Sequence, residues 1–261
     1  MKLWQHRFNL IFFLLWPIVA AWMSLNFPIN ALLSSVVFYG IPAGLLSFYR
    51  PEYIKKSLIV SLSGIPFLII VDYIAELTGA WLWPLPHSVV PFKLFGYVSI
   101  EVLLWGFLHA YIVIMFFQYF FEKTFTKKIL DSRSKKVVLL TTITFIIFLG
   151  ALFIHPDILN IPYWYLVFGT IGILPLVVFE DWKYPKVFHR LLKTGAYFFY
   201  LNFTYEITAL KVGWWSFPSK QFIGYVSFFD ITFPFEEFFF WIVLFTLAIL
   251  SYYEYFFNRE K

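Results

Sequence analysis

Eight apolar segments follow one another along the chain, and each is about as long as a bilayer-spanning helix. A helix that crosses the hydrocarbon core of a bilayer needs about 20 mostly apolar residues. Lipid offers the backbone no hydrogen-bond partner, so a spanning segment is helical. The pattern predicts an all-α polytopic membrane protein with transmembrane helices over residues 8–23, 31–48, 57–77, 97–121, 137–154, 162–179, 187–210 and 234–257.

The composition agrees with this pattern and excludes a water-soluble globular protein. Hydrophobic residues make up 61% of the 261 residues and aromatic residues 25%, whereas only 13% are charged. An ordinary globular domain has roughly a quarter of its residues charged. The chain has no cysteine, which excludes disulfides and thiol chemistry.

The basic residues predict how the bundle is oriented. If the N-terminus is cytoplasmic, 17 of the 20 Lys and Arg residues fall on the cytoplasmic side, and only Lys93, Lys211 and Lys220 fall outside. Cytoplasmic loops carry such an excess of Lys and Arg. We therefore expect a multi-pass protein of the cell membrane with both termini in the cytoplasm. Its net charge of +5 reflects contact with the lipid bilayer and not with nucleic acid.

The two halves of the chain share several features in the same order, at an offset of about 130 residues. The paired features are Gly40-Ile41-Pro42 with Gly172-Ile173-Leu174-Pro175, Asp72-x-x-x-Glu76 with Asn202-x-x-x-Glu206, and the tetrapeptide Gly-Tyr-Val-Ser at 96–99 and at 224–227. Glu101 and Glu237 each lie 18 residues before a Tyr-Phe-Phe sequence. The pattern predicts two repeats of four helices, 1–122 and 137–261, joined by a basic cytoplasmic linker, 123–136. Because each repeat has an even number of spans, the repeats should be parallel, with a site between them.

Six carboxyl side chains lie near the non-cytoplasmic ends of the predicted helices: Asp72, Glu76, Glu101, Glu206, Glu236 and Glu237. An ionised carboxylate at the centre of a spanning helix costs roughly 2.5–3.5 kcal/mol, so such groups face a protein interior or water. The favourable field at a helix N-terminus explains Glu101, Glu236 and Glu237 without catalysis, and for any one of the six a structural role is as good an explanation as a functional one. Their paired occurrence in both halves favours catalysis, because a carboxyl that keeps its proton in an apolar cavity can protonate an alkene.

Aromatic residues accompany these acids. The rings we expect to bind substrate and to stabilise a carbocation are Trp81, Trp83, Trp214, Trp215, Phe235 and Phe238. Their faces attract a cation, at about 2 kcal/mol or more per desolvated contact, and excluding water protects the cation from capture. The histidines have no metal-ligand spacing and the chain has no phosphate-binding glycine loop, so we expect neither a metal nor a nucleotide cofactor.

The sequence Pro-Phe-Glu-Glu-Phe-Phe-Phe at 234–240, with an upstream acid and tryptophan in each half, resembles the integral-membrane lycopene cyclases. This family includes heterodimeric bacterial and archaeal enzymes and the cyclase domain of fungal bifunctional cyclase–phytoene synthases. The similarity covers most of the chain, taken as a fusion of the two halves. The first half departs from the pattern, since 98–102 reads Val-Ser-Ile-Glu-Val, and Asn202 replaces the acid expected opposite Asp72.

The resemblance implies a cofactor-independent isomerase of carotenoid biosynthesis. Its substrate would be lycopene or a related linear carotenoid, whose ends are cyclised to β-ionone rings, and it would contact other enzymes of the pathway. The implied acid and base are Glu236, Glu237 and Glu101, with Glu206, Glu76 and Asp72 as orienting or relay groups.

Three alternatives remain open from the sequence. A carotenoid end-group hydratase would use the same protonation and let water capture the cation. A membrane prenyltransferase would use the Asp72 and Asn202 motifs with Mg²⁺ and basic partners for diphosphate, and the predicted outer surface is poor in such basic residues. A lipid or proton-coupled transporter would use the acids as a relay without catalysis.

Overall fold

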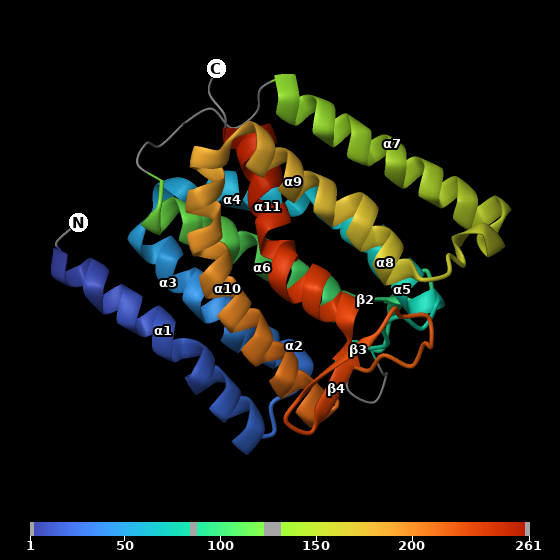
Figure 1. The fold of residues 1–261 in the computed structure, drawn as a ribbon, viewed down its shortest axis with the longest axis horizontal. Coiled ribbons are helices and arrows are strands. Elements are labelled where there is room, and N and C mark those ends of the chain that lie inside the picture. The colour runs from blue at the N-terminus through green and yellow to red at the C-terminus, as the bar shows by residue number, and fades with distance from the viewer. Residues whose placement is uncertain (1–2, 84–87, 123–131, 259–261) are drawn as a thin grey trace.

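The computed structural model describes residues 3–83, 88–122 and 132–258, with side chains from Phe8 onward, and folds them into eight helical rods (Figure 1). Four rods are single helices: α1 (Leu3–Asn26), α6 (Ile100–Phe120), α7 (Ser132–Ile154) and α10 (Pro185–Val212). The second and third rods comprise α2 (Ala31–Ser35), η1 (Val36–Gly40) and α3 (Ile41–Tyr49), then η2 (Pro51–Tyr53), α4 (Ile54–Ser63) and α5 (Ile65–Leu77). The sixth and eighth comprise α8 (Trp164–Phe168), η5 (Gly169–Ile173) and α9 (Leu174–Lys183), then η6 (Glu237–Leu244), α11 (Phe245–Tyr253) and η7 (Glu254–Asn258).

The rods confirm the predicted all-helical class, and their lengths and composition agree with a multi-pass membrane protein. Within the described ranges, seven of them are long and apolar enough to cross a membrane. The remaining rod is α10, which has 28 residues but carries Lys186, Arg190 and Lys193 in its first turns. Every predicted span coincides with one rod. Much of the predicted linker, 123–131, lies outside the described residues.

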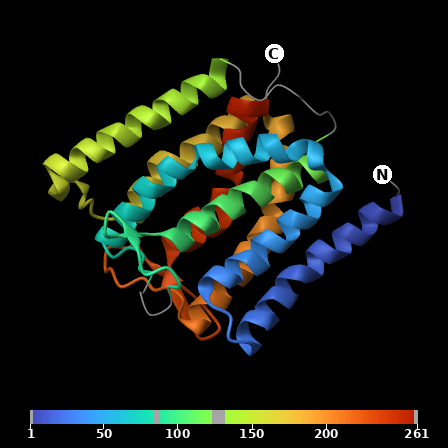
Figure 2. The same ribbon diagram turned by 180° about the vertical axis from the view of Figure 1, so that it is seen from behind.

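The rods are arranged as a core with two peripheral helices. Helix α6 contacts α3, α4, α5, α10 and α11 and is therefore central. Helices α1 and α7 lie on opposite sides of the bundle in both views (Figures 1 and 2), where α1 packs on α10 and α7 packs on α5. The large apolar side chains of α7 are mostly exposed, as expected for a helix that faces lipid.

Two of the composite rods contain a π-helical turn that ends two residues before a proline. Turn η1 precedes Pro42, and turn η5 precedes Pro175. Proline has no N–H and its ring clashes with the carbonyl four residues earlier, so the helix widens locally instead of continuing its regular bonding. These turns displace neighbouring side chains from regular helical positions, which matters for the site described below.

Two short hairpins precede the fourth and eighth rods. Strand β1 (Lys93–Leu94) pairs with β2 (Val98–Ser99), and β3 (Tyr225–Phe228) pairs with β4 (Ile231–Pro234), both antiparallel. The predicted helices at 97–121 and 234–257 were therefore wrong at their starts, where the chain is still in a strand. The shared Gly-Tyr-Val-Ser tetrapeptide also occupies different places, since it ends in β2 in the first hairpin and in β3 in the second.

Glycine permits close packing between the sixth and eighth rods. A Cβ atom built at Gly169 would lie 2.2 Å from Cδ2 of the buried Phe240 ring, whereas one built at Gly150 on α7 would meet nothing within 4 Å. We expect Gly169→Ala to destabilise the fold by about 1–3 kcal/mol, because a rigid ring must move. Gly150→Ala is the control and should leave stability unchanged or slightly higher. Thermal unfolding of both variants in detergent checks this, and equal melting temperatures would contradict it.

Candidate functional site

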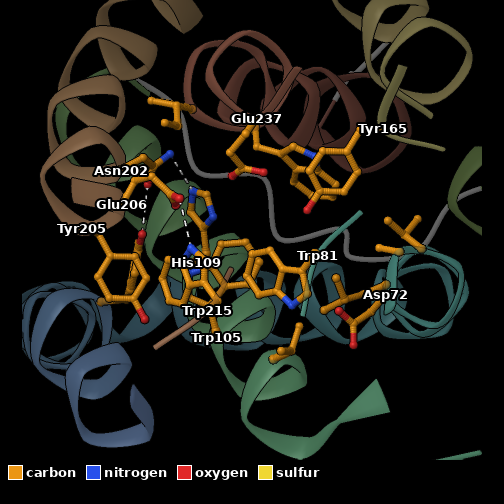
Figure 3. A pocket seen from close by; sticks show the side chains of 17 residues that line it. Asp72, Trp81, Trp105, His109, Tyr165, Asn202, Tyr205, Glu206, Trp215 and Glu237 are labelled. Atoms are coloured by element: carbon orange, nitrogen blue, oxygen red, sulfur yellow. Dashed lines mark hydrogen bonds between the residues drawn. The ribbon is translucent and has the colours of Figure 1, made fainter. Parts of the chain in front are cut away.

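A cavity of about 40 Å³ lies among helices from both parts of the chain (Figure 3). Its walls come from η1, α5 and α6 on one side and from α8, α10 and η6 on the other. The lining includes three carboxyl groups, and its other polar or aromatic members are Tyr39, Trp81, Trp105, His109, Tyr165, Asn202, Tyr205, Trp215 and Trp241. The site thus combines acids with indole and phenol rings at a junction between distant segments.

Three of the predicted acids meet in this cavity. Asp72 comes from α5, Glu206 from α10 and Glu237 from the first residue of η6, and each is at most 5% exposed. The cavity lining, as far as the structure describes it, includes no Lys or Arg. Glu206 Oε1 accepts a hydrogen bond from Trp215 Nε1 at 3.0 Å, and the Glu237 carboxyl faces the Tyr165 hydroxyl. Glu206 and Glu237 therefore have neutral partners, whereas Asp72 also lies in the field of Lys93, the cation that binds Glu76.

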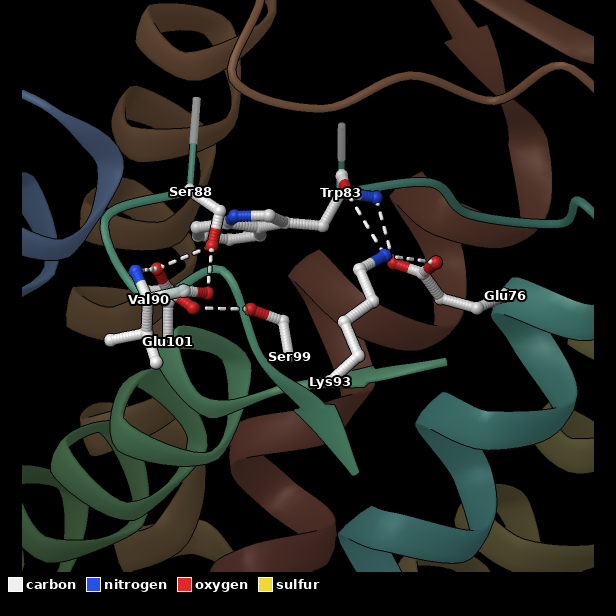
Figure 4. A network of polar contacts seen from close by, with 7 residues as sticks. All are labelled: Glu76, Trp83, Ser88, Val90, Lys93, Ser99 and Glu101. Carbon is white, nitrogen blue, oxygen red and sulfur yellow. Dashed lines mark hydrogen bonds and ion pairs between the residues drawn. The ribbon is translucent and has the colours of Figure 1, made fainter. Parts of the chain in front are cut away.

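Glu76 is buried but is held by a cation outside the cavity. Its Oε2 lies 2.7 Å from Lys93 Nζ, and its Oε1 accepts the Trp83 N–H at 2.8 Å (Figure 4). The same Lys93 amine donates to the Trp83 carbonyl at 3.1 Å. The ion pair therefore fixes the backbone of Trp83 from both sides, and we interpret Glu76 as a structural residue.

Glu101 and Glu236 fix loops in a similar way. Glu101 Oε1 accepts from Ser88 Oγ at 2.6 Å and from the backbone N–H groups of Val89 and Val90 at 2.7 and 2.9 Å (Figure 4). Glu236 Oε1 accepts the N–H of Ile223 at 2.8 Å. Each of these glutamates lies two residues after a hairpin strand, so they occupy equivalent places. Neither residue lines the cavity.

The tryptophans form a stack over one end of the cavity. Trp81 stacks on Trp215 with ring centroids 5.2 Å apart and planes at 15°, and Trp83 stacks on the same ring at 5.9 Å. The two loops are joined by reciprocal backbone bonds, since Leu82 N donates to Ser216 O at 2.9 Å and Ser216 N donates back at 3.1 Å. Trp81 and Trp215 line the cavity.

The other predicted aromatic residues lie outside the lining. Trp83 and Trp214 are buried, and each contacts Trp215 without lining the cavity itself. Phe235 is 36% exposed, and Phe238 packs on Phe228 of the second hairpin. The sequence therefore identified the region of the site but not which rings face the cavity.

A polar network that the sequence analysis missed forms another wall. The Tyr39 hydroxyl donates to Asn202 Oδ1 at 3.1 Å, and Asn202 Nδ2 lies 3.4 Å from His109 Nε2 and 3.5 Å from Thr246 Oγ1. His109 is 1% exposed in the middle of α6. An ionisable side chain in the middle of an apolar span marks a functional site more often than a structural one, and this signal could have identified His109.

No family model, curated protein or solved structure matches this chain. The fold and the cavity define a polytopic α-helical membrane protein with an internal, acid-lined and aromatic-walled site. Its chemistry is therefore inferred from its own residues.

The ion pair between Lys93 and Glu76 provides a test of the structural interpretation. We expect Lys93→Met to destabilise the protein by about 3–5 kcal/mol, because it leaves a buried carboxylate without its cation. Arg50→Met is the control, since its partner Glu52 is 40% exposed, and it should cost about 0–1 kcal/mol. Denaturant unfolding in detergent measures both free energies. A Lys93→Met protein as stable as the Arg50→Met protein would show that the buried pair does not hold the loop.

Proposed function

We propose that this chain is a membrane enzyme that cyclises the ends of a linear carotenoid such as lycopene by redox-neutral acid–base catalysis. One observation carries the proposal. Carboxyl groups from three separate helices meet in an aromatic-walled cavity whose described lining has no cation. Such a site can provide a proton and can accept one, which is what an isomerisation without cofactor requires.

The three carboxyls are suited to opposite roles in one reaction. Glu206 and Glu237 are buried beside one another with no Lys or Arg in the described lining, so ionising both at once is strongly unfavourable. At least one therefore keeps its proton as the acid, while an ionised neighbour acts as the base. We assign the acid to Glu237, because Tyr165 faces its carboxyl and its Oε2 has no hydrogen-bond partner among the described residues.

The proposed reaction conserves atoms and electrons. The carboxyl proton is transferred to the terminal double bond, whose electrons form the new C–H bond and leave a tertiary carbocation. A neighbouring double bond attacks this cation and closes the ring. A carboxylate then removes the adjacent proton, and that C–H electron pair becomes the ring double bond. Trp81 and Trp215 line the cavity beside the acids, where aromatic rings would stabilise the cation before the ring is deprotonated.

The size of the cavity sets a requirement on substrate binding. A volume of about 40 Å³ holds roughly three water molecules, which is less than the end group of a carotenoid needs. The walls must therefore move apart when the substrate enters. Both η1, which carries Tyr39, and η6, which begins at Glu237, are π-helical, and such irregular turns are frequent at functional sites.

The arrangement of helices supports the proposed pair of parallel repeats with cytoplasmic termini. The first helix of each half packs on the third rod of the other, since α1 contacts α10 and α7 contacts α5. A hairpin precedes the last rod of each half. The start of α1 and the end of η7 lie at the end of the bundle away from the hairpins (Figure 1), as an even number of spans requires.

Adjacent glutamates provide a matched test of the proposed function. In membranes from cells that accumulate lycopene, we expect the wild-type chain to form cyclic carotenoids. Glu237→Gln should lower the rate at least about 100-fold, because general acid catalysis contributes 10²–10⁴-fold. Glu236→Gln should retain most activity, because its amide oxygen can still accept the Ile223 N–H. Chromatography of the pigments measures both rates, normalised to membrane-inserted protein.

Two outcomes would contradict the proposal. Unchanged lycopene in the presence of folded, inserted wild-type protein would exclude cyclisation of this substrate. Full activity of Glu237→Gln would remove that residue as the acid. Hydroxylated products in place of rings from the wild-type chain would identify a hydratase instead.

A further inference from the structure

Several buried polar atoms in the cavity have no partner in the protein. Trp81 Nε1, Trp241 Nε1 and His109 Nδ1 have none among the described residues, and neither have Asp72 Oδ2 and Glu237 Oε2. Trp105 Nε1 has none either, but that indole lies beside the Tyr39 hydroxyl. The other five side chains all line the cavity. In Figure 3 the Trp81 indole nitrogen lies on the side of Asp72. Buried polar atoms are normally hydrogen-bonded, so five unpartnered atoms around one cavity point to a polar ligand.

The hydrogen-bond network indicates that His109 is a donor toward the cavity. The Tyr39 hydroxyl donates to Asn202 Oδ1, which leaves the Asn202 amide hydrogens directed at His109 Nε2 and Thr246. A neutral imidazole that accepts at Nε2 carries its hydrogen on Nδ1. The cavity therefore presents three N–H donors, from His109, Trp81 and Trp241, together with two carboxyl oxygens.

This set of groups matches a hydroxyl oxygen and does not match a hydrocarbon. An oxygen atom with two lone pairs accepts two N–H bonds, and its hydrogens donate to carboxyl oxygens. A polyene can satisfy neither kind of group. The cavity volume of about 40 Å³ suits roughly three water molecules, each of which usually makes about three hydrogen bonds in a buried site.

We propose that the cavity is a binding site for hydroxyl oxygen, filled in the resting protein by two or three waters that accept from Trp81, Trp241 and His109 and donate to Asp72 and Glu237. The consequence for catalysis rests on the proposed function. Water whose lone pairs accept two N–H bonds has none available to attack a carbocation. A neighbouring bound water that keeps a free lone pair can return a proton from the carboxyl that removed it to the carboxyl that delivered it.

Radiolytic hydroxyl labelling tests the water site without substrate or activity. Side chains that touch bound water are oxidised within milliseconds of irradiation, even when they are buried. In purified protein in lipid nanodiscs, we expect Trp81 and Trp241 to be oxidised at least about fivefold faster than Trp83. Trp83 is the internal control, because its Nε1 is also buried and unpartnered but the ring lies outside the cavity lining. Equal oxidation of the three rings would overturn the proposal.

The product ratio tests the catalytic consequence. With lycopene in proteoliposomes in H₂¹⁸O, Trp81→Phe and Trp241→Phe each free a lone pair of the bound water. Both variants should raise the hydroxylated fraction of products at least about tenfold, with ¹⁸O in the new hydroxyl. Trp16→Phe is the control, because its indole donates to Val37 O away from the cavity, and it should keep the wild-type ratio.

The outcomes separate this proposal from the proposed function. If the wild-type chain forms rings and neither cavity variant raises the hydroxylated fraction, the water is not held by the indoles and the inference fails while the cyclase remains. Hydroxyl groups without ¹⁸O would show that the oxygen does not come from water, since lycopene itself carries none, and would overturn the role of the bound water. If neither the wild-type protein nor the variants form rings, the oxidation rates alone test the water site. Faster oxidation of Trp81 and Trp241 than of Trp83 then still supports bound water.

Discussion

Lipid cannot form hydrogen bonds, and this constraint sorts the buried carboxyl groups of the bundle into two kinds. A carboxyl at membrane depth either binds a partner within the protein or faces an internal space. Glu101 and Glu236 accept hydrogen bonds from the backbone of loops. Glu76 does the same and also binds the amine of Lys93. Glu206 and Glu237 face the cavity instead. The first kind holds the hairpins and the indole stack in place, so that the second kind can remain buried without a cation.

The two halves of the chain use similar positions for different purposes. Glu101 and Glu236 occupy equivalent places after the hairpins, which makes Val102 the counterpart of Glu237. Both Val102 and Glu237 line the cavity. Glu76 pairs with Lys93, whereas Glu206, which the sequence pattern predicts as its counterpart, lies in the cavity. The halves therefore build one asymmetric site at their junction, where each contributes different chemistry.

The lengths of the apolar segments were enough to predict the rods, because each such segment must be helical in lipid. It could not predict the hairpins, since β2 and β4 are themselves apolar and extend the runs that follow them. The pattern of acids located the site. It could not separate the glutamates that bind loops from those that line the cavity, because both are single glutamates in apolar surroundings. Glu76 differs from Glu206 in having Lys93 beside it, and this position of Lys93 is visible only in the structure. Tyr39 reaches the cavity from a π-helical turn, which helical spacing does not reveal.

The outer helices interlock the two halves. Helix α1 rests on α10, and α7 rests on α5, so neither half contains all the surfaces that its own first helix needs. During synthesis α1 enters the membrane long before α10 exists. Helix α1 can pack on η1 and α6 as soon as they are inserted, but its contact with α10 must wait until that helix has been made. Assembly of the cavity is thus a late event, because the walls from α8, α10 and η6 are the last to be synthesised.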